Sequence, residues 1–126
     1  MKKEVIAGIF LVVILISCII NISYINNLSN ELVLLIEDAE KQTLADNWNN
    51  ATTKIENAIT LWENNKTYTS IVLPHEKIDL ATDSLYDLLG DINAQDTAKV
   101  PGSVQKAASR FEDIASMEQI SIKSIF

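Results

Sequence analysis

An uncharged apolar run opens the chain and predicts a membrane segment. From Val5 to Ile25 the sequence reads VIAGIFLVVILISCIINISYI, about 21 residues, which is the length that a helix needs to cross a hydrocarbon core. Lys2 and Lys3 precede the run, and the first charged residue after it is Glu31. Because basic residues favour the cytoplasmic side, we expect residues 1–4 in the cytoplasm, residues 5–25 in the membrane and residues 26–126 as an extracytoplasmic domain.

The one cysteine of the chain allows a second interpretation of this run. Residues 15–18, Leu-Ile-Ser-Cys, fit the bacterial lipobox, in which cleavage before Cys18 accompanies its lipidation. Two lysines and an apolar region precede the cysteine, as in a signal peptide. The run continues through Ile19, Ile20 and Ile22, however, where a lipoprotein normally has a polar tether. An uncleaved anchor is therefore favoured, with lipidation of Cys18 as the first alternative and ordinary cleavage as the second.

Four amphipathic segments follow, each with apolar residues three or four positions apart, as on one face of a helix. The first, residues 28–44, is expected to continue the membrane helix. The second starts after Asp46, its expected N-cap, and must end by the residue before Pro74, which lacks an amide hydrogen. The third covers residues 76–92, and the fourth starts between residues 97 and 103. The apolar stripes of the four segments, in chain order, are Leu28, Leu32, Leu35, Ile36 and Ala39 in the first; Trp48, Ala51, Ile55, Ala58, Ile59 and Trp62 in the second; Ile78, Ala81, Leu85, Leu88 and Ile92 in the third; and Val104, Ala107, Ala108, Phe111 and Ile114 in the fourth.

Two stretches fit the helical pattern less well. Residues 67–72 are rich in β-branched side chains, which weaken a helix. Residues 118–126 alternate isoleucine with polar residues, which predicts a short strand or an extended cover over the bundle, and we favour a packed tail. Four amphipathic helices joined by short turns bury their stripes most simply as an antiparallel bundle. The predicted fold is all-α, a transmembrane helix that continues into about four helices arranged as helical hairpins.

Composition and charge exclude several classes of protein. The chain has 3 glycines and 2 prolines, too few turn residues for a β-sandwich or barrel. The formal net charge is −7, and the residues after the apolar run include 8 basic and 16 acidic ones. Phosphate backbones would be repelled by this excess, so no nucleic acid partner is expected.

An acidic ladder stands out along the third predicted helix. Asp79, Asp83, Asp87 and Asp91 recur every four residues, a spacing at which like charges destabilise a helix. Helix stability therefore does not explain the ladder. A solvated face is the simpler interpretation, and a surface for a basic partner or a cation is the functional one.

The remaining candidates for chemistry have structural explanations. His75 stands beside Glu76 and four residues before Asp79, too few ligands for a metal, and the two carboxylates favour the positive start of a helix. Trp48 and Trp62 share the apolar face of the second helix, which indicates core packing rather than sugar stacking. The sequence has no phosphate-binding glycine loop and no nucleophile elbow. We predict no catalytic, cofactor-binding or metal-binding residue, no cofactor and a protein that is not an enzyme.

Several short motifs, taken in order, resemble a known family. After the Lys-Lys start and the apolar run come residues 28–32, Leu-Ser-Asn-Glu-Leu; then Asn47-Trp48, Trp62, and residues 75–79, His-Glu-Lys-Ile-Asp. This layout resembles domain of unknown function 4363, a family of short membrane-anchored proteins from Gram-positive, often spore-forming bacteria. Members tend to have a polar residue before the histidine and Asn-Ile near the C-terminus, where this chain has Pro74 and Ser124. The resemblance implies a cellular location and no reaction.

Two functional hypotheses follow from an anchored, acidic, helical domain. The first is a non-enzymatic interaction or scaffold protein of the bacterial cell envelope that binds another envelope protein or itself. The second is a ligand-binding sensor or cell-wall binding module that uses exposed aromatic residues or the acidic ladder, in one version as a lipoprotein lipidated at Cys18.

Overall fold

The computed structural model describes the backbone of residues 1–125 and the side chains of residues 1–117, and this part of the protein consists of helices joined by short turns. No strand occurs within these bounds, so the predicted all-α class is confirmed. The described helices are α1 (Lys2–Leu44), α2 (Trp48–Asn64), α3 (Lys66–Val72), α4 (His75–Asn93) and α5 (Val100–Ile125).

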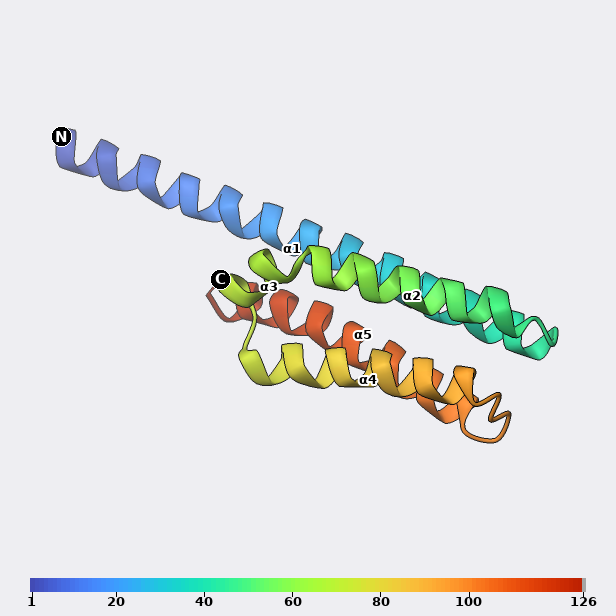
Figure 1. The fold of residues 1–126 in the computed structure, drawn as a ribbon. Coiled ribbons are helices and arrows are strands. Elements are labelled where there is room, and N and C mark those ends of the chain that lie inside the picture. The colour runs from blue at the N-terminus through green and yellow to red at the C-terminus, as the bar shows by residue number, and fades with distance from the viewer. Residues whose placement is uncertain (126) are drawn as a thin grey trace.

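Four of these helices form an antiparallel bundle (Figure 1). The second half of α1 packs beside α2 and α5, and α4 packs beside the same two helices, so the four close a ring around one core. The first half of α1 extends alone beyond the bundle, and α5 ends near the point where it leaves (Figure 1). The predicted bundle of helical hairpins is therefore confirmed.

The core is built from the apolar stripes of the sequence. All five stripe positions of α4 are buried, and so are Leu32, Ile36 and Ala39 of α1. Burial on α1 begins at Ile25, which is 1% exposed. Apolar spacing of three and four places these side chains on one face of each helix, and the ring of helices removes that face from water.

Two turns of the same design close the bundle at the end far from the solitary half of α1. Asp46 and Gln95 have φ angles of 60° and 53°, in the left-handed region. The amide of Gln95 donates to the carbonyl of Ile92 at 2.9 Å, and the amide of Asp96 donates to that of Asp91 at 3.0 Å. This pair of bonds is a Schellman motif, and equivalent bonds close α1 around Asp46.

The prediction that Asp46 caps the second helix is wrong. Asn47 is the N-cap of α2, because Asp46 is used to end α1. Aspartate tolerates the left-handed conformation better than most residues, which suits it to this position. Its carboxylate accepts a hydrogen bond from the indole of Trp48, with 2.8 Å between Nε1 and Oδ1.

The predicted second helix is in fact two helices, separated at Asn65. The side-chain amide of Asn65 donates to the carbonyl of Leu61 at 2.7 Å, in competition with the backbone bonds that would continue α2. The chain then forms α3, and Leu73 adopts extended angles of −114° and 149°, as expected for a residue before proline.

The last helix is longer than predicted. It begins at Val100, inside the predicted range, and its backbone remains helical to Ile125. The two extended forms predicted for residues 118–126, a short strand or an extended cover over the bundle, are therefore wrong as far as Ile125. Packing of that tail against the bundle concerns side chains outside the described residues.

Replacing Gln95 with glycine is expected to stabilise the bundle by about 0.5 to 1 kcal/mol, because glycine adopts a positive φ without a steric cost. Thermal unfolding followed by circular dichroism should then show a midpoint roughly 2 to 8 °C higher. Ala94→Gly is the matched control, because Ala94 has ordinary helical angles and glycine there should lower the midpoint. A rise in both variants, or in neither, would contradict the assignment of the turn.

Candidate interaction surfaces

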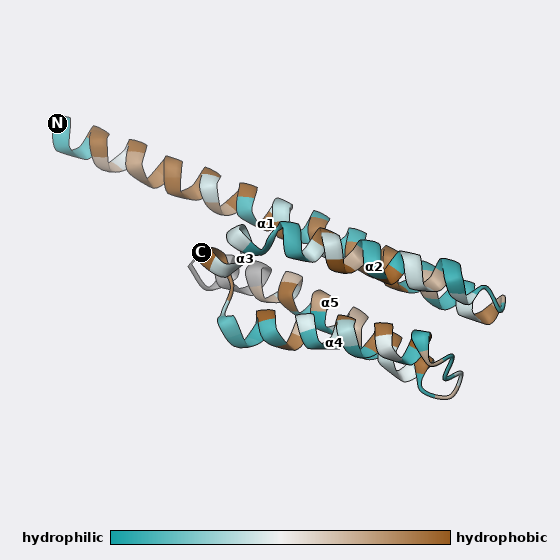
Figure 2. Ribbon diagram, in the orientation of Figure 1, coloured by the Kyte–Doolittle hydropathy of each residue, from teal (hydrophilic) through white to brown (hydrophobic). Residues whose placement is uncertain are grey.

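The solitary half of α1 is an apolar surface with no partner in the described chain. The side chains from Val5 to Ile20 include large apolar residues that are 46–66% exposed, and Figure 2 shows the corresponding brown band. The most apolar window of α1 has a mean hydropathy of 3.0 and none of it is buried. By length and composition this helix is a candidate membrane span, a description that a signal sequence would also satisfy.

Cys18 lies within this apolar half of α1. It is a free cysteine of intermediate exposure, and the helix continues through it without a break. Seven residues further on, Ile25 is already in the core. The chain therefore has no irregular segment between Cys18 and the bundle.

The acidic ladder lies on α4, where Asp79, Asp83 and Asp87 are exposed and Asp91 is half-buried. A step of four residues turns a helix by about 40° beyond a full turn, so the ladder winds gradually around α4. The carboxylate of Asp91 accepts a hydrogen bond from the hydroxyl of Ser103 on α5. Among the described residues, no three acidic, histidine or cysteine side chains are placed to hold a metal ion.

His75 and the tryptophans occupy the positions that a structural explanation predicts. His75 and Glu76 are exposed in the first turn of α4. Trp62 is 2% exposed, donates from its indole to the Thr82 hydroxyl at 2.8 Å and meets the ring of Phe111 edge-on at 5.1 Å. Trp48 is half-buried at the rim of the core, so the tryptophans do not form an exposed pair.

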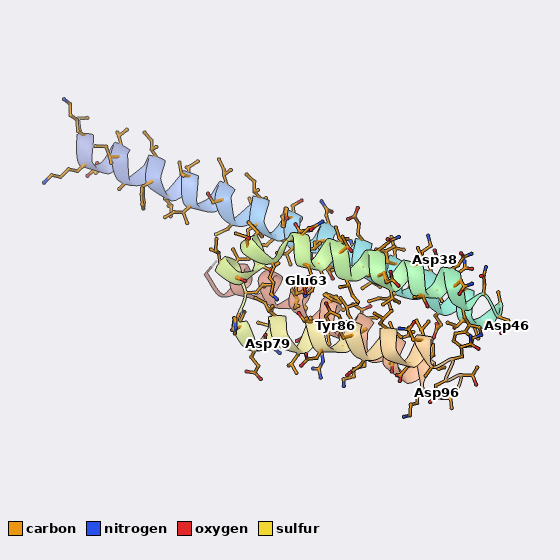
Figure 3. The ribbon with its side chains drawn as sticks, viewed as in Figure 1. Asp38, Asp46, Glu63, Asp79, Tyr86 and Asp96 are labelled. Atoms are coloured by element: carbon orange, nitrogen blue, oxygen red, sulfur yellow. The ribbon has the colours of Figure 1, made fainter. Side chains whose placement is uncertain are left out.

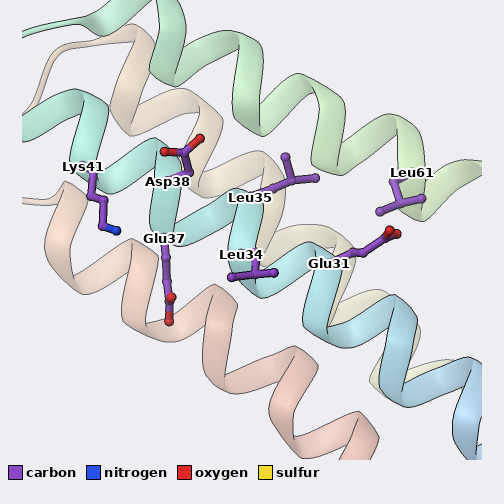
Figure 4. Close-up of a pocket in the computed structure, with 7 residues that line it drawn as sticks. All are labelled: Glu31, Leu34, Leu35, Glu37, Asp38, Lys41 and Leu61. Carbon is purple, nitrogen blue, oxygen red and sulfur yellow. The ribbon is translucent and has the colours of Figure 1, made fainter.

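An open groove between α1 and α2 is the surface that sequence analysis missed. It has a volume of about 550 Å³, and its apolar part comes from Leu34, Leu35 and Leu61. Figure 4 shows the lining along α1, with Leu61 contributed by α2. Leu34 is 65% exposed, which makes it the most accessible apolar side chain of the groove. The full lining is Glu31, Leu34, Leu35, Glu37, Asp38, Lys41 and Leu61.

Carboxylates dominate the charge around this groove. The lining has three acidic residues and one basic residue, Lys41. Lys54 on α2 pairs with Asp38 at 3.1 Å, and both side chains are partly exposed. Glu31 and Glu37 have no such ion pair among the described contacts, and neither has Lys41, so these three residues leave the rim an excess of one negative charge.

The sequence contains a feature that points to the groove. Residues 32–36, Leu-Val-Leu-Leu-Ile, are all apolar, whereas a single helical stripe needs only some of them. Leu32 and Ile36 fill the core at 0% exposure. Of the three residues between them, Val33 and Leu35 are partly buried against the core, and Leu34 is left outside.

Comparison with known proteins identifies a family but no individual protein that is similar to the chain. No curated protein and no solved structure matches the chain significantly. The family described as Domain of unknown function (DUF4363) matches residues 19–125, which include the bundle-forming half of α1 and all of α2, α3, α4 and α5. The resemblance noted from the short motifs is thereby confirmed, and the chain belongs to the DUF4363 family.

Proposed function

We propose that this protein is a single-pass membrane protein of the bacterial envelope that binds another envelope protein through the α1–α2 groove. The anchor lies in the apolar run of residues 5–25, whose last residues, from Asn21 to Ile25, already contact the rest of the fold. The N-terminus is cytoplasmic and residues 26–126 form the extracytoplasmic domain. The observation that carries this proposal is the continuity of α1, which passes from an exposed apolar half into the core of the bundle without a break. Such a helix holds the groove at a fixed height above the membrane.

The charges on either side of the apolar run support this orientation. Lys2 and Lys3 lie before it, and the next basic residue along the chain is Lys41, surrounded by acidic residues. The cytoplasmic side of a membrane retains lysine and arginine near the ends of a span. The acidic domain is therefore assigned to the outer side.

The uncleaved form of the anchor is favoured by the path of the chain around Cys18. A lipoprotein generally joins its domain to the lipidated cysteine through a flexible segment, whereas here Ile25 is in the core and all intervening residues are helical. Cys18 is thus proposed to be a lipid-facing residue of the span.

The chemistry of the groove defines the kind of partner. A segment that places apolar side chains on Leu34 and Leu35 and basic side chains near Glu31 and Glu37 would match both features of the lining. A second copy of this chain would bring an equally acidic groove to the contact, and like charges would oppose the pairing. A different protein with a basic amphipathic helix is therefore the proposed partner.

A binding role also agrees with the positions of the other candidate residues. Trp62 is enclosed in the core and cannot stack on a sugar ring. We assign Asp79, Asp83 and Asp87 to a solvated face that adds to the negative potential of the domain. The proposed role requires no catalytic residue, cofactor or metal.

One experiment tests both the location and the groove. In a Cys18→Ser background, Leu34→Cys and Tyr86→Cys each provide a single reactive thiol, and intact cells are treated with a membrane-impermeant maleimide that carries a photoreactive group. Tyr86, labelled in Figure 3, is a matched control because it is 50% exposed and lies on α4, which contributes no residue to the groove. Both thiols should react from outside, and illumination should attach a second protein at Leu34→Cys alone.

Each other outcome contradicts a defined part of the proposal. Thiols that react only after cell lysis would overturn the extracytoplasmic location. Labelling of both positions without an adduct specific to Leu34→Cys would overturn binding at the groove. An adduct with twice the mass of the chain would replace the proposed partner with a second copy.

A further inference from the structure

The short helix α3 occupies the end of the bundle from which the solitary half of α1 emerges (Figure 1). Two tyrosines attach it to α1. The hydroxyl of Tyr68 donates to the side-chain oxygen of Asn21, the hydroxyl of Tyr24 donates to that of Asn65, and the two rings lie 4.3 Å apart between centroids. The position of α3 along α1 is therefore fixed at residues 21–24.

Residues 21–24 are the place where the apolar surface of α1 ends. Ile20 is 62% exposed and belongs to the proposed span, and Tyr24 is 38% exposed. Four helical residues correspond to about 6 Å along the axis. If the apolar half of α1 lies in the hydrocarbon core, the tyrosine pair and α3 lie at its boundary with water.

The outer surface of α3 has the character of an interfacial element. Ile71 is 79% exposed, more than Ile20 in the proposed span. The neighbouring Thr67 and Ser70 are also exposed and uncharged. Lys66 is the one charged residue of α3, so this helix lacks the carboxylates that would oppose an anionic membrane surface.

We propose that α3 rests on the bilayer, with Ile71 inserted at the boundary between the headgroups and the acyl chains. This inference depends on the proposed anchoring through α1 and names the lipid surface as the occupant. Tyrosine rings favour the same depth, and an interfacial helix buries apolar side chains roughly 5 to 10 Å into that boundary. Together α1 and α3 would give the bundle two contacts with the membrane and so fix its tilt.

The test measures depth in the membrane with the full chain. Three Cys18→Ser variants carry one cysteine each, at Ile71, Leu44 or Ile16, labelled with an environment-sensitive fluorophore and reconstituted in phosphatidylcholine vesicles. Leu44 is matched to Ile71 because both are 79% exposed, yet Leu44 ends α1 at the far end of the bundle. Ile16 lies in the proposed span.

The three positions distinguish a failure of the α3–membrane contact from a failure of the α1 anchor. Label at Ile71 should show blue-shifted emission and be quenched most by spin labels near the top of the acyl chains, whereas label at Leu44 should stay water-like. Label at Ile16 should be quenched most by spin labels deep in the chains. Water-like emission at Ile71 with deep quenching at Ile16 would overturn the interfacial role of α3 while leaving the anchor intact. Water-like emission at Ile16 would overturn both. Circular dichroism of each variant checks that the bundle is folded.

Discussion

Replacing Trp62 with alanine is expected to lower the free energy of unfolding of the bundle by about 3 to 5 kcal/mol. Trp62 on α2 lies where all four helices of the bundle meet, close to Ile25, Leu32 and Phe111, and its indole reaches Thr82 on α4. Alanine would leave a cavity that these neighbours cannot fill. A domain of about 100 residues is stable by only about 5 to 15 kcal/mol, so the loss is a large part of the total.

The measurement is denaturant unfolding of the full chain in detergent, followed by far-ultraviolet circular dichroism. Trp48→Ala is the matched control, since the same residue type on the same helix is only half-buried and its indole is bonded to an exposed carboxylate. It should lose roughly 1 to 2 kcal/mol. Trp62→Phe, which keeps much of the ring and loses the hydrogen bond to Thr82, should fall between wild type and Trp62→Ala. Equal losses in the two alanine variants would contradict the central position of Trp62.

The sequence predicted the helices because one physical rule, burial of an apolar face, determines most of this fold. In α4 the stripe from Ile78 to Ile92 repeats at intervals of three and four, and each of its members is buried. The observed bounds of α4, His75–Asn93, differ from the predicted ones by a single residue at each end.

The errors arise where side chains bond to the backbone or take a rare backbone conformation. Asp46 is equally suited to an N-cap and to a left-handed turn, and only the position of α1 relative to α2 decides between them. Asn65 ends α2 through one side-chain bond to a carbonyl, which helical periodicity does not reveal. The tail is helical up to Ile125 although its isoleucines alternate as in a strand.

The candidate surfaces were less predictable than the fold because they depend on which apolar residues the bundle leaves uncovered. Leu34 and Ile71 are both exposed, yet each sits in a segment whose other apolar residues are buried or half-buried. Ser29 shows the reverse case, a polar residue 4% exposed that donates to the carbonyl of Phe111 at 2.7 Å. Helical spacing determines which face of a helix is apolar on the whole, and tertiary packing determines whether these individual residues are buried or exposed.

Two aspartates in the middle of the apolar run, Val12→Asp with Ile16→Asp, are expected to abolish membrane integration. An aspartate near the centre of a spanning helix costs about 2.5 to 3.5 kcal/mol, so the pair should oppose insertion by roughly 6 kcal/mol. Val12 and Ile16 are 54% and 51% exposed and lie far from the core that begins at Ile25, so the bundle itself loses no contact. The measurement is the share of the chain that stays with membranes after alkaline carbonate extraction.

The control and a companion variant separate anchoring by the helix from anchoring by lipid. Val12→Leu with Ile16→Leu changes the same positions without charge and should remain fully membrane-bound. Cys18→Ser should also remain bound, at the full-length intact mass, because the uncleaved helix needs no acyl chain. Release of Cys18→Ser from the membrane, or a wild-type mass that corresponds to cleavage before Cys18 with added acyl chains, would make the protein a lipoprotein. Retention of the double aspartate variant would show that the apolar half of α1 is not the anchor, and the groove and α3 would then have to be placed against a different surface.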